Sequence, residues 1–266
     1  MAGQGPAGLD VTTPNIARMY DHFLHGKDNF AADREAADKL TALMPQLPAI
    51  ARDNRAFVRR AVRFAAGRGI RQFIDVGAGL PTQGNVHEVA RGAAPDATVV
   101  YVDNDPVVCT HGRALLADGA VGIVEADLRR PDQILGDPLT RTLIDFAEPV
   151  ALLCTSVLHF VPDDDDPHAV IGRFGDVMAP GSLLVISHGT LETDPDDARA
   201  RLSTEVYSQA SAPLTLRSIE SVRRLFDGFD LVDPGLVWIS EWRPGPSEGI
   251  SELAETLRGG VGLKRS

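Results

Sequence analysis

Residues 73–82 (FIDVGAGLPT) decide the fold of this chain, because an apolar strand pattern there runs directly into a glycine turn. A second apolar stretch, residues 99–105 (VVYVDND), follows and brings Asp103 to a point 24 residues after Gly79. Two parallel strands joined through a helix would set both acidic ends at one edge of a sheet. The pattern therefore predicts a βαβ unit that holds a nucleoside cofactor across the carboxyl ends of its strands.

The glycines and acids of this unit indicate which nucleoside it binds. Gly77 and Gly79 permit backbone angles and a close approach that a β-carbon would block, and Asp103 is placed to accept hydrogen bonds from both ribose hydroxyls. Asp75 would repel a pyrophosphate but suits the ammonium and sulfonium groups of S-adenosylmethionine. The third glycine of the dinucleotide fingerprint is missing, because Thr82 occupies its position, so we favour S-adenosylmethionine over NAD. A purely structural glycine turn that Asp75 caps stays open as an alternative.

Length and composition limit the class of protein. With 266 residues the chain suits one α/β domain with an appendage, and its net charge of −11 argues against a nucleic-acid partner. Cys109 and Cys154 are too few for a disulfide framework or a cysteine-rich metal site. Residues 1–14 lack the pattern of a signal peptide, and no apolar run reaches the length of a membrane span. We therefore expect a cytoplasmic protein with no membrane partner.

The order of the patterns predicts three helices followed by alternating strands and helices. The helices are expected over residues 14–26, 31–44 and 49–66, and the strands over residues 71–76, 98–102, 122–125, 149–155, 182–187, 229–232 and 236–242. The last two strands are separated by residues 233–235 (DPG), which suits a turn between antiparallel neighbours. We expect a helical lid over residues 1–69, a cofactor-binding domain over 70–244 and a tail over 245–266.

With this order in view, the chain resembles the class I S-adenosylmethionine-dependent methyltransferases from residue 71 to about residue 242. Residues 15–30, 79–87 and 187–190 further resemble an actinobacterial branch of that class, the domain family once called DUF574, and this match covers nearly the whole chain. The resemblance implies a Rossmann-like, doubly wound α/β fold. Its sheet would have seven mostly parallel strands with an antiparallel last strand, under an N-terminal helical lid.

The resemblance also implies a set of cofactor-binding residues: Tyr20, Asp75, Gly77, Ala78, Gly79, Asp103, Asn104, Asp127, Leu128 and Thr155. The Asp75 motif would surround the methionine portion, Asp103 would hold the ribose, and Asn104 would lie beside the adenine edge. Asp127 would accept from the adenine amino group, although on spacing alone it could equally cap the segment that follows. Leu80 departs from the commoner third glycine of the class, which leaves the contact at that point open.

The same resemblance gives roles to the remaining parts of the site. Leu128 would pack on the adenine ring, and Thr155 would offer its backbone near the cofactor amine. Tyr20 belongs to a strip of the lid that would contact the cofactor, or alternatively to the packed face of an amphipathic helix.

Transfer of methyl to a hydroxyl generally needs a base with a pKa near neutrality, for which histidine is suited. His159 is the first candidate, because residues 156–163 (SVLHFVPD) resemble the segment where some small-molecule O-methyltransferases place their base. His188 is the second, and a structural imidazole stays open for each. His22 and His25 are three apart on the first helix, but no third ligand accompanies them and we expect no metal.

Three functions are compatible with these motifs. The leading one is a methyltransferase for a small-molecule acceptor, with O- or N-methylation undecided, whose acceptor pocket lies between the lid and residues 191–216 and is lined by Glu205 and Tyr207. The second is a non-catalytic sensor or interaction protein that binds S-adenosylmethionine or its demethylated product. An NAD-dependent oxidoreductase is disfavoured by Asp75 and the incomplete glycine fingerprint.

Overall fold

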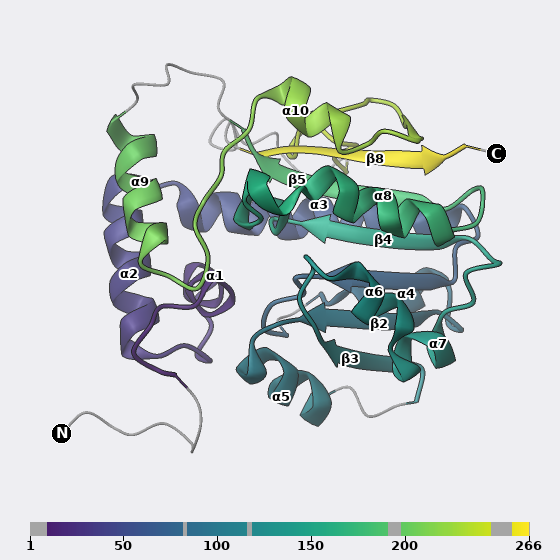
Figure 1. The fold of residues 1–266 in the computed structure, drawn as a ribbon, viewed down its shortest axis with the longest axis horizontal. Coiled ribbons are helices and arrows are strands. Elements are labelled where there is room, and N and C mark those ends of the chain that lie inside the picture. Colours follow the sequence, from purple (N-terminus) through teal and green to yellow (C-terminus); the bar gives the residue numbers. More distant parts are fainter. Residues whose placement is uncertain (1–9, 82–83, 116–118, 191–197, 246–256, 266) are drawn as a thin grey trace.

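The computed structural model describes residues 10–81, 84–115, 119–190, 198–245 and 257–265. Within these residues eight strands form one sheet in the order β3-β2-β1-β4-β5-β8-β6, and β7 also pairs with β8 (Figure 1). The strands are β1 (Gln72–Val76), β2 (Thr98–Asp103), β3 (Val121–Glu125), β4 (Val150–Thr155), β5 (Leu183–Gly189), β6 (Phe229–Leu231), β7 (Val237–Trp238) and β8 (Leu257–Lys264). The first five are parallel to one another, and β8 is antiparallel to β5, β6 and β7.

The described part of the chain has ten α-helices, of which the first three precede β1. They are α1 (Ile16–Phe23), α2 (Ala31–Leu43), α3 (Leu47–Gly67), α4 (Val86–Ala93), α5 (Pro106–Leu115), α6 (Pro131–Gly136), α7 (Pro138–Leu143), α8 (Pro167–Val177), α9 (Ala198–Ser208) and α10 (Ile219–Arg224). Short 3₁₀ turns, η1 (Leu158–Phe160) and η2 (Asp163–Asp165), follow β4. This alternation confirms the predicted α/β class, with a mostly parallel sheet and N-terminal helices.

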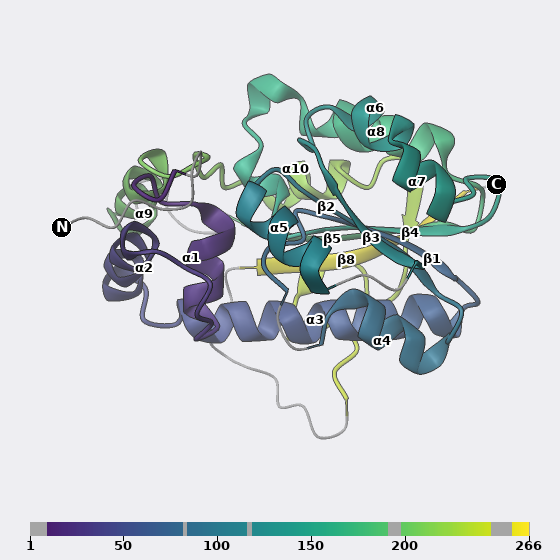
Figure 2. The same cartoon turned by 90° about the horizontal axis from the view of Figure 1, so that it is seen from below.

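Helices cover both faces of the sheet, as Figure 2 shows with α3 and α4 on one side and α6, α7 and α8 on the other. The strands β4 and β5 are buried along almost their whole length, because both of their faces are covered. Each face has its own apolar cluster: Phe73 and Leu153 pack with α3 and α4 on one face, and Ile74 and Leu152 pack with α6 and α8 on the other.

The helices α1, α2 and α9 form a separate layer beyond the carboxyl ends of β1 to β5 (Figure 1). Their apolar side chains make a third cluster around Met19, Phe23 and Leu40, against which Tyr207 of α9 also packs. This layer, called the lid from here on, therefore combines the N-terminal helices α1 and α2 with α9, which comes after β5. The helix α3 instead packs in the main core through Phe57. The residues that pack in the main core therefore begin before residue 69, within the segment expected to form the lid.

The tail expected from residue 245 is where the structure corrects the sequence analysis most. Its last part is β8, which pairs with β5 along seven positions and makes the sheet eight-stranded rather than seven-stranded. Both β6 and β7 pair with β8, so they run in the same direction and are not the antiparallel neighbours that the Asp-Pro-Gly segment suggested.

Glycines explain why β8 was missed. Three of its eight residues are glycine, which is a weak strand former and suggests a loop. In the folded chain these glycines make room for large side chains: a β-carbon at Gly262 would lie 2.8 Å from Cβ of Phe229 and 2.9 Å from the ring of Phe226. Close packing against the two aromatic rings therefore requires glycine at this position.

No helix of the described residues is long and apolar enough to cross a membrane.

Replacing Gly262 with alanine should destabilise the protein, because the added methyl group would force a shift of Phe229 or Phe226. We expect a loss of about 1–3 kcal/mol in the free energy of unfolding, seen as a lower midpoint in urea denaturation. Gly92→Ala in α4 is the matched control, since a β-carbon there meets nothing within 4 Å and alanine favours a helix. Equal midpoints for Gly262→Ala and the unmodified protein would contradict this account of β8.

Candidate functional site

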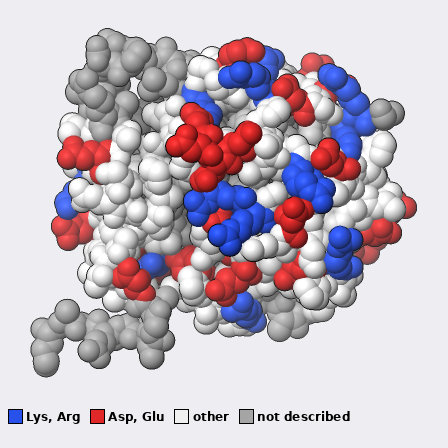
Figure 3. Space-filling model, in the orientation of Figure 1, with Lys and Arg blue, Asp and Glu red and all other residues white. Residues whose placement is uncertain are grey.

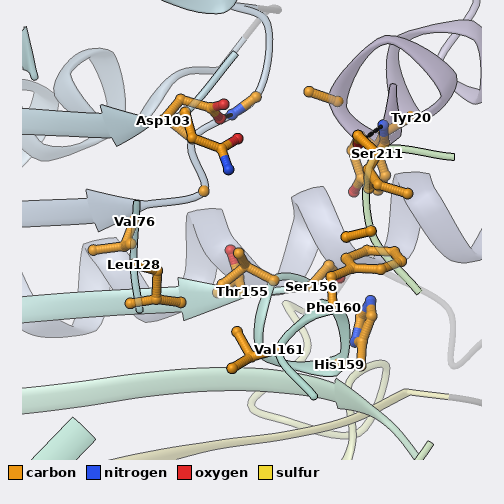
Figure 4. A pocket seen from close by; sticks show the side chains of 18 of the residues that line it. Tyr20, Val76, Asp103, Leu128, Thr155, Ser156, His159, Phe160, Val161 and Ser211 are labelled. Atoms are coloured by element: carbon orange, nitrogen blue, oxygen red, sulfur yellow. Dashed lines mark hydrogen bonds between the residues drawn. The ribbon is translucent and has the colours of Figure 1, made fainter. Parts of the chain in front are cut away.

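A cavity of about 290 Å³ lies where the carboxyl ends of the parallel strands meet the lid. Figure 4 shows its two ends: Asp103, Val76 and Leu128 lie at one end, and Tyr20, Phe160 and His159 lie at the other, with Thr155 between them. The carboxyl edge of a parallel sheet is where α/β proteins usually bind ligands.

The structure brings the predicted site residues together. All ten predicted cofactor residues line this one cavity, together with His159: Tyr20, Asp75, Gly77, Ala78, Gly79, Asp103, Asn104, Asp127, Leu128 and Thr155. Tyr207, expected in the acceptor pocket, lines it as well. Glu205 is exposed and His188 is fully buried, and neither lines the cavity. Thr82 and residues 191–197 lie outside the described residues.

The glycine turn after β1 has the geometry that the motif predicts. Gly77 and Gly79 have φ angles of 70° and 66°, in the left-handed region that favours glycine. A β-carbon on Gly77 would lie 2.4 Å from a methyl group of Val157, so a larger residue would not fit there. The backbone N–H of Gly77 donates to the carbonyl of Val102 at 2.8 Å, which holds the turn against β2.

Asp103 ends β2 and is fixed by backbone donors. The N–H of Gly79 donates to its Oδ2 and the N–H of Asp105 donates to its Oδ1, each at 2.9 Å. Burial raises the pKa of Asp103 to about 6, although these two hydrogen bonds act in the opposite direction. The carboxylate oxygens keep further lone pairs that can accept from hydroxyl groups in the cavity.

Asp75 is buried at the end of β1 and lines the cavity. Burial raises its pKa to about 7; the Arg55 guanidinium lowers the pKa in part and Asp103 raises it further. A buried carboxylate is costly, and a positive charge beside it would remove that cost. The site is therefore electrostatically suited to a cationic group next to the glycine turn.

Arg55 of α3 lines the same part of the cavity and was not singled out from the sequence. Its Nη2 donates to the carbonyl of Gly84 at 3.2 Å, but its Nε is buried without a partner among the described residues. The signal in the sequence was the polar pair Asn54 and Arg55, which interrupts the apolar pattern of α3 just before Phe57. A guanidinium group that lines a cavity suits a carboxylate ligand.

Asp127 follows β3 and is held by an ion pair. Both of its carboxylate oxygens accept from Arg129, whose Nε lies 3.0 Å from each, and Arg129 also reaches Asp165 at 3.2 Å. The hydrogen bond from Arg129 lowers the pKa of Asp127. Figure 3 shows acidic and basic side chains interspersed on this side of the molecule. The carboxylate is ionised and can still accept a donor from the cavity.

The acidic run before α8, residues 163–166, leads into the start of that helix. Asp166 is the N-cap residue of α8, and its side chain accepts from the N–H of Ala169 at 3.0 Å. Among the described residues no group of three or more possible metal ligands is present.

The lid is tied to the site through buried polar contacts. The Tyr20 hydroxyl donates to the carbonyl of Ala51 at 3.0 Å and accepts from the Asn54 amide at 3.1 Å, so its ring forms a fixed wall. Arg18 of α1 contacts Asp105 at 3.1 Å and Asp33 at 3.5 Å, and all three side chains are buried. Asp105 is the residue whose backbone fixes Asp103, so α1 is held directly against the Asp103 end of the cavity.

His159 and His188 form a buried pair behind the other end of the cavity, with ring centroids 5.3 Å apart. The N–H of Gly189 donates to Nδ1 of His159 at 3.2 Å, and Arg217 donates from Nη1 to Nε2 of His188 at 2.9 Å. Burial, His188 and Arg217 lower the pKa of His159 well below its usual range. Burial likewise lowers the pKa of His188 to about 4, so both imidazoles are neutral at physiological pH.

The sheet order, the glycine turn and the paired acids define the class: a Rossmann-like, S-adenosylmethionine-dependent methyltransferase fold. A model of the S-adenosyl methyltransferase family matches residues 2–265, and this chain belongs to that family.

Solved structures agree with this assignment. The chain is 39% identical to a candidate methyltransferase from Thermobifida fusca YX, with 100% of each chain covered and a TM-score of 0.90. It is 38% identical to a DUF574 family protein from Streptomyces avermitilis MA-4680, with 96% of this chain and 99% of the other covered and a TM-score of 0.90. Human N-acetylserotonin methyltransferase in complex with S-adenosylmethionine shares the fold alone, at 14% identity, a TM-score of 0.52, and coverage of 95% of this chain and 63% of the other. No curated protein matches the chain.

Ligand affinity should depend on pH through Asp75. A ligand that brings an ammonium group to Asp75 favours the ionised carboxylate, so its affinity is fully present above pH 7 and falls as the pH drops through 7. Below pH 7 the Asp75 carboxyl must lose its proton before the ligand binds. We therefore expect the Kd of S-adenosylhomocysteine, measured by calorimetry, to rise about tenfold for each pH unit below 7. Asp75→Asn should bind weakly at every pH and show a flatter profile. A Kd that is constant between pH 8 and 5.5 in the unmodified protein would contradict the assignment.

Proposed function

We propose that this protein is an S-adenosylmethionine-dependent methyltransferase that acts on a small-molecule acceptor. The observation that carries the proposal is the buried Asp75 carboxylate that lines the cavity beside the glycine turn, in the same cavity as an apolar far end. A cationic cofactor at Asp75 leaves the far end for a second ligand. Phe160 lies at that end with the ring of Tyr207 beside it, and these aromatic side chains suit an apolar acceptor.

The residues present fit the cofactor group by group. Asp75 would bind the ammonium group, and Arg55, whose side chain lines the cavity, would bind the carboxylate of the methionine portion. Asp103 would accept from the ribose hydroxyls with the lone pairs that its backbone donors leave free.

Side chains at the same end of the cavity would hold the adenine. Leu128 would pack on the ring and Asn104 would lie at its edge, while Asp127 would share its carboxylate between Arg129 and the adenine amino group. Thr155, at the end of β4, would lie close to the cofactor amine. When bound, the cofactor supplies a methyl group on a positively charged sulfur, whose leaving thioether is neutral.

The lid has a defined task in this proposal. A cover excludes water from the reacting groups and fixes the approach of the acceptor. The contacts of Arg18 with Asp105 and Asp33 hold α1 over the cavity. They thereby fix the position of the acceptor end of the cavity relative to the cofactor end.

A sensor that binds the same cofactor without turnover is the second candidate, because neither histidine is a secure base. An NAD-dependent oxidoreductase is disfavoured, since the buried Asp75 would repel a pyrophosphate at the glycine turn.

S-adenosylhomocysteine should raise the melting temperature of the purified protein, while NAD should not. A ligand at one hundred times its Kd adds about 2.7 kcal/mol to the stability of a folded state that alone binds it, which corresponds to several degrees. Asp103→Asn should abolish the shift by weakening the hold on the ribose. Asp96→Asn is the matched control, because Asp96 is an exposed acid at the opposite edge of the sheet that pairs with Arg71. An undiminished shift for Asp103→Asn would remove the ribose assignment.

Turnover separates an enzyme from a sensor. With methyl-labelled S-adenosylmethionine and an extract of small metabolites, an enzyme should release labelled methylated product in proportion to protein and time. Asp103→Asn should release at least tenfold less, since a weakened ribose contact lowers occupancy. Tight binding with no labelled product from any fraction would favour the sensor.

A further inference from the structure

We infer that His159 donates a hydrogen bond to the methyl acceptor instead of removing its proton, and that the acceptor atom is an oxygen that arrives already ionised. This inference rests on the proposed function, because it concerns the acceptor end of the same cavity. It replaces the role of base that the sequence predicts for His159 and defines the substrate class: a flat, apolar molecule that carries a phenolate or carboxylate oxygen.

The backbone of β5 decides which nitrogen of His159 carries the proton. Gly189 donates its N–H to Nδ1 of His159 at 3.2 Å, and a backbone N–H can only donate. Nδ1 therefore carries a lone pair, and in the neutral ring the proton lies on Nε2. Nε2 has no hydrogen-bond partner among the described residues, while His159 lines the cavity, so Nε2–H is the group available to a ligand.

This arrangement is the reverse of what a base requires. A base at Nε2 needs its proton on Nδ1, where an acceptor such as a carboxylate normally holds it. Here a proton on Nδ1 would face the N–H of Gly189, and the same conflict would arise in the imidazolium form. The geometry therefore stabilises the donor form of Nε2 against both alternatives.

A second buried histidine reinforces the neutral state. Arg217 donates to Nε2 of His188 at 2.9 Å, so Nδ1 of His188 carries the proton and donates to the carbonyl of Gly189 at 2.7 Å. Arg217 is itself held by the carboxylate of Asp163 and by the carbonyls of Leu158 and Val161. The charged groups near His159 are thus the Arg217 guanidinium and, behind it, Asp163, and the nearer of the two opposes protonation of His159.

The donor at Nε2 also selects the kind of acceptor atom. An amine nitrogen has one lone pair, which cannot accept a hydrogen bond from His159 and attack a methyl group at the same time. An ionised oxygen has three lone pairs, so it can accept from Nε2–H and still present a lone pair to the methyl group. A hydrogen bond to the charged oxygen is stronger than one to a neutral group, which favours binding of the ionised form.

No other described residue at this end of the cavity serves as a base. The Tyr20 hydroxyl is occupied by Ala51 and Asn54, and burial raises the pKa of Tyr207. The rings and aliphatic side chains at this end of the cavity favour a ligand with a flat apolar body. Among them, the ring centroids of Phe160 and Tyr207 lie 5.3 Å apart. The carboxylates of Asp75 and Asp103 belong to the cofactor end, as Figure 4 shows for Asp103.

The transfer is balanced without a proton acceptor on the protein. The oxygen lone pair forms the O–CH3 bond, the S–CH3 bond breaks, and its electron pair stays on sulfur. The negative oxygen and the positive sulfur both become neutral. The proton of the acceptor has already been lost to water before binding.

The first test is the tautomer itself, read without any cofactor or acceptor. In the full chain labelled with 15N-histidine, the long-range 1H–15N spectrum should show Nδ1 of His159 unprotonated and Nε2 protonated from pH 5 to pH 8. The signals are assigned by their loss in His159→Gln. A proton on Nδ1, or titration of this ring within that range, overturns the inference.

The second test uses defined probes in the presence of saturating S-adenosylhomocysteine. We expect 4-nitrophenol to bind as its coloured phenolate, benzoate to bind, or both to bind. Which of the two probes binds shows whether the acceptor oxygen belongs to a phenolate or to a carboxylate. His159→Gln keeps a donor at the same reach and should bind the ionised probe nearly as well. His159→Phe keeps a ring but lacks the donor and should bind it at least tenfold more weakly, with 4-nitroanisole unaffected by either change.

The remaining outcomes are decisive as well. If neither ionised probe binds, or if 4-nitroaniline binds as tightly as 4-nitrophenol, the substrate class is wrong. If S-adenosylhomocysteine itself does not bind, the proposed function fails, and the tautomer measurement still reports on His159 alone. Tight S-adenosylhomocysteine binding with a proton on Nδ1 leaves the proposed function intact and removes only this inference.

Discussion

The hydrogen bond from the N–H of Gly79 to Oδ2 of Asp103, at 2.9 Å, is the contact on which the rest of the site depends. It joins the glycine turn of β1 to the end of β2, so two segments 24 residues apart become one surface. The same carboxylate accepts from the N–H of Asp105, and Asp105 pairs with Arg18 of α1. One chain of polar contacts therefore connects the turn, Asp103 and the lid, and each helps to position the next.

The electrostatic character of the cavity follows from burying two carboxylates within one site. Burial raises the pKa of Asp75 to about 7 and that of Asp103 to about 6, because the charged forms lose their hydration. Perturbed carboxylates in a cleft are typical of functional sites. The ionised form of Asp75, which burial disfavours in the free protein, becomes favourable when a cation lies beside it. The site therefore has a physical preference for an ammonium group over a pyrophosphate.

At the other end of the cavity a backbone group, rather than a side chain, sets the chemistry. Gly189 presents its N–H to Nδ1 of His159, where a catalytic histidine would usually meet an acceptor. Arg217 and His188 hold the surrounding loop and strand in place and keep the neighbourhood of His159 positive. A histidine that is neutral and donates at Nε2 suits the recognition of an oxygen that needs no base.

The sequence by itself determined the α/β class, the glycine turn, the strand-end acids and the approximate bounds of β1 to β5. These features are local: periodicity reports which faces are covered, and glycine next to an acid reports a turn with a particular chemistry. Tertiary structure decided the rest. The strand β8 has a glycine-rich sequence and becomes a strand because β5 offers a partner and aromatic rings fill the space its glycines leave. Arg55 joins the site because α3 passes the end of β1, and the donor state of His159 depends on a backbone group 30 residues away. Such contacts between distant segments are specified only when the chain packs, since no local pattern records which group a side chain will meet.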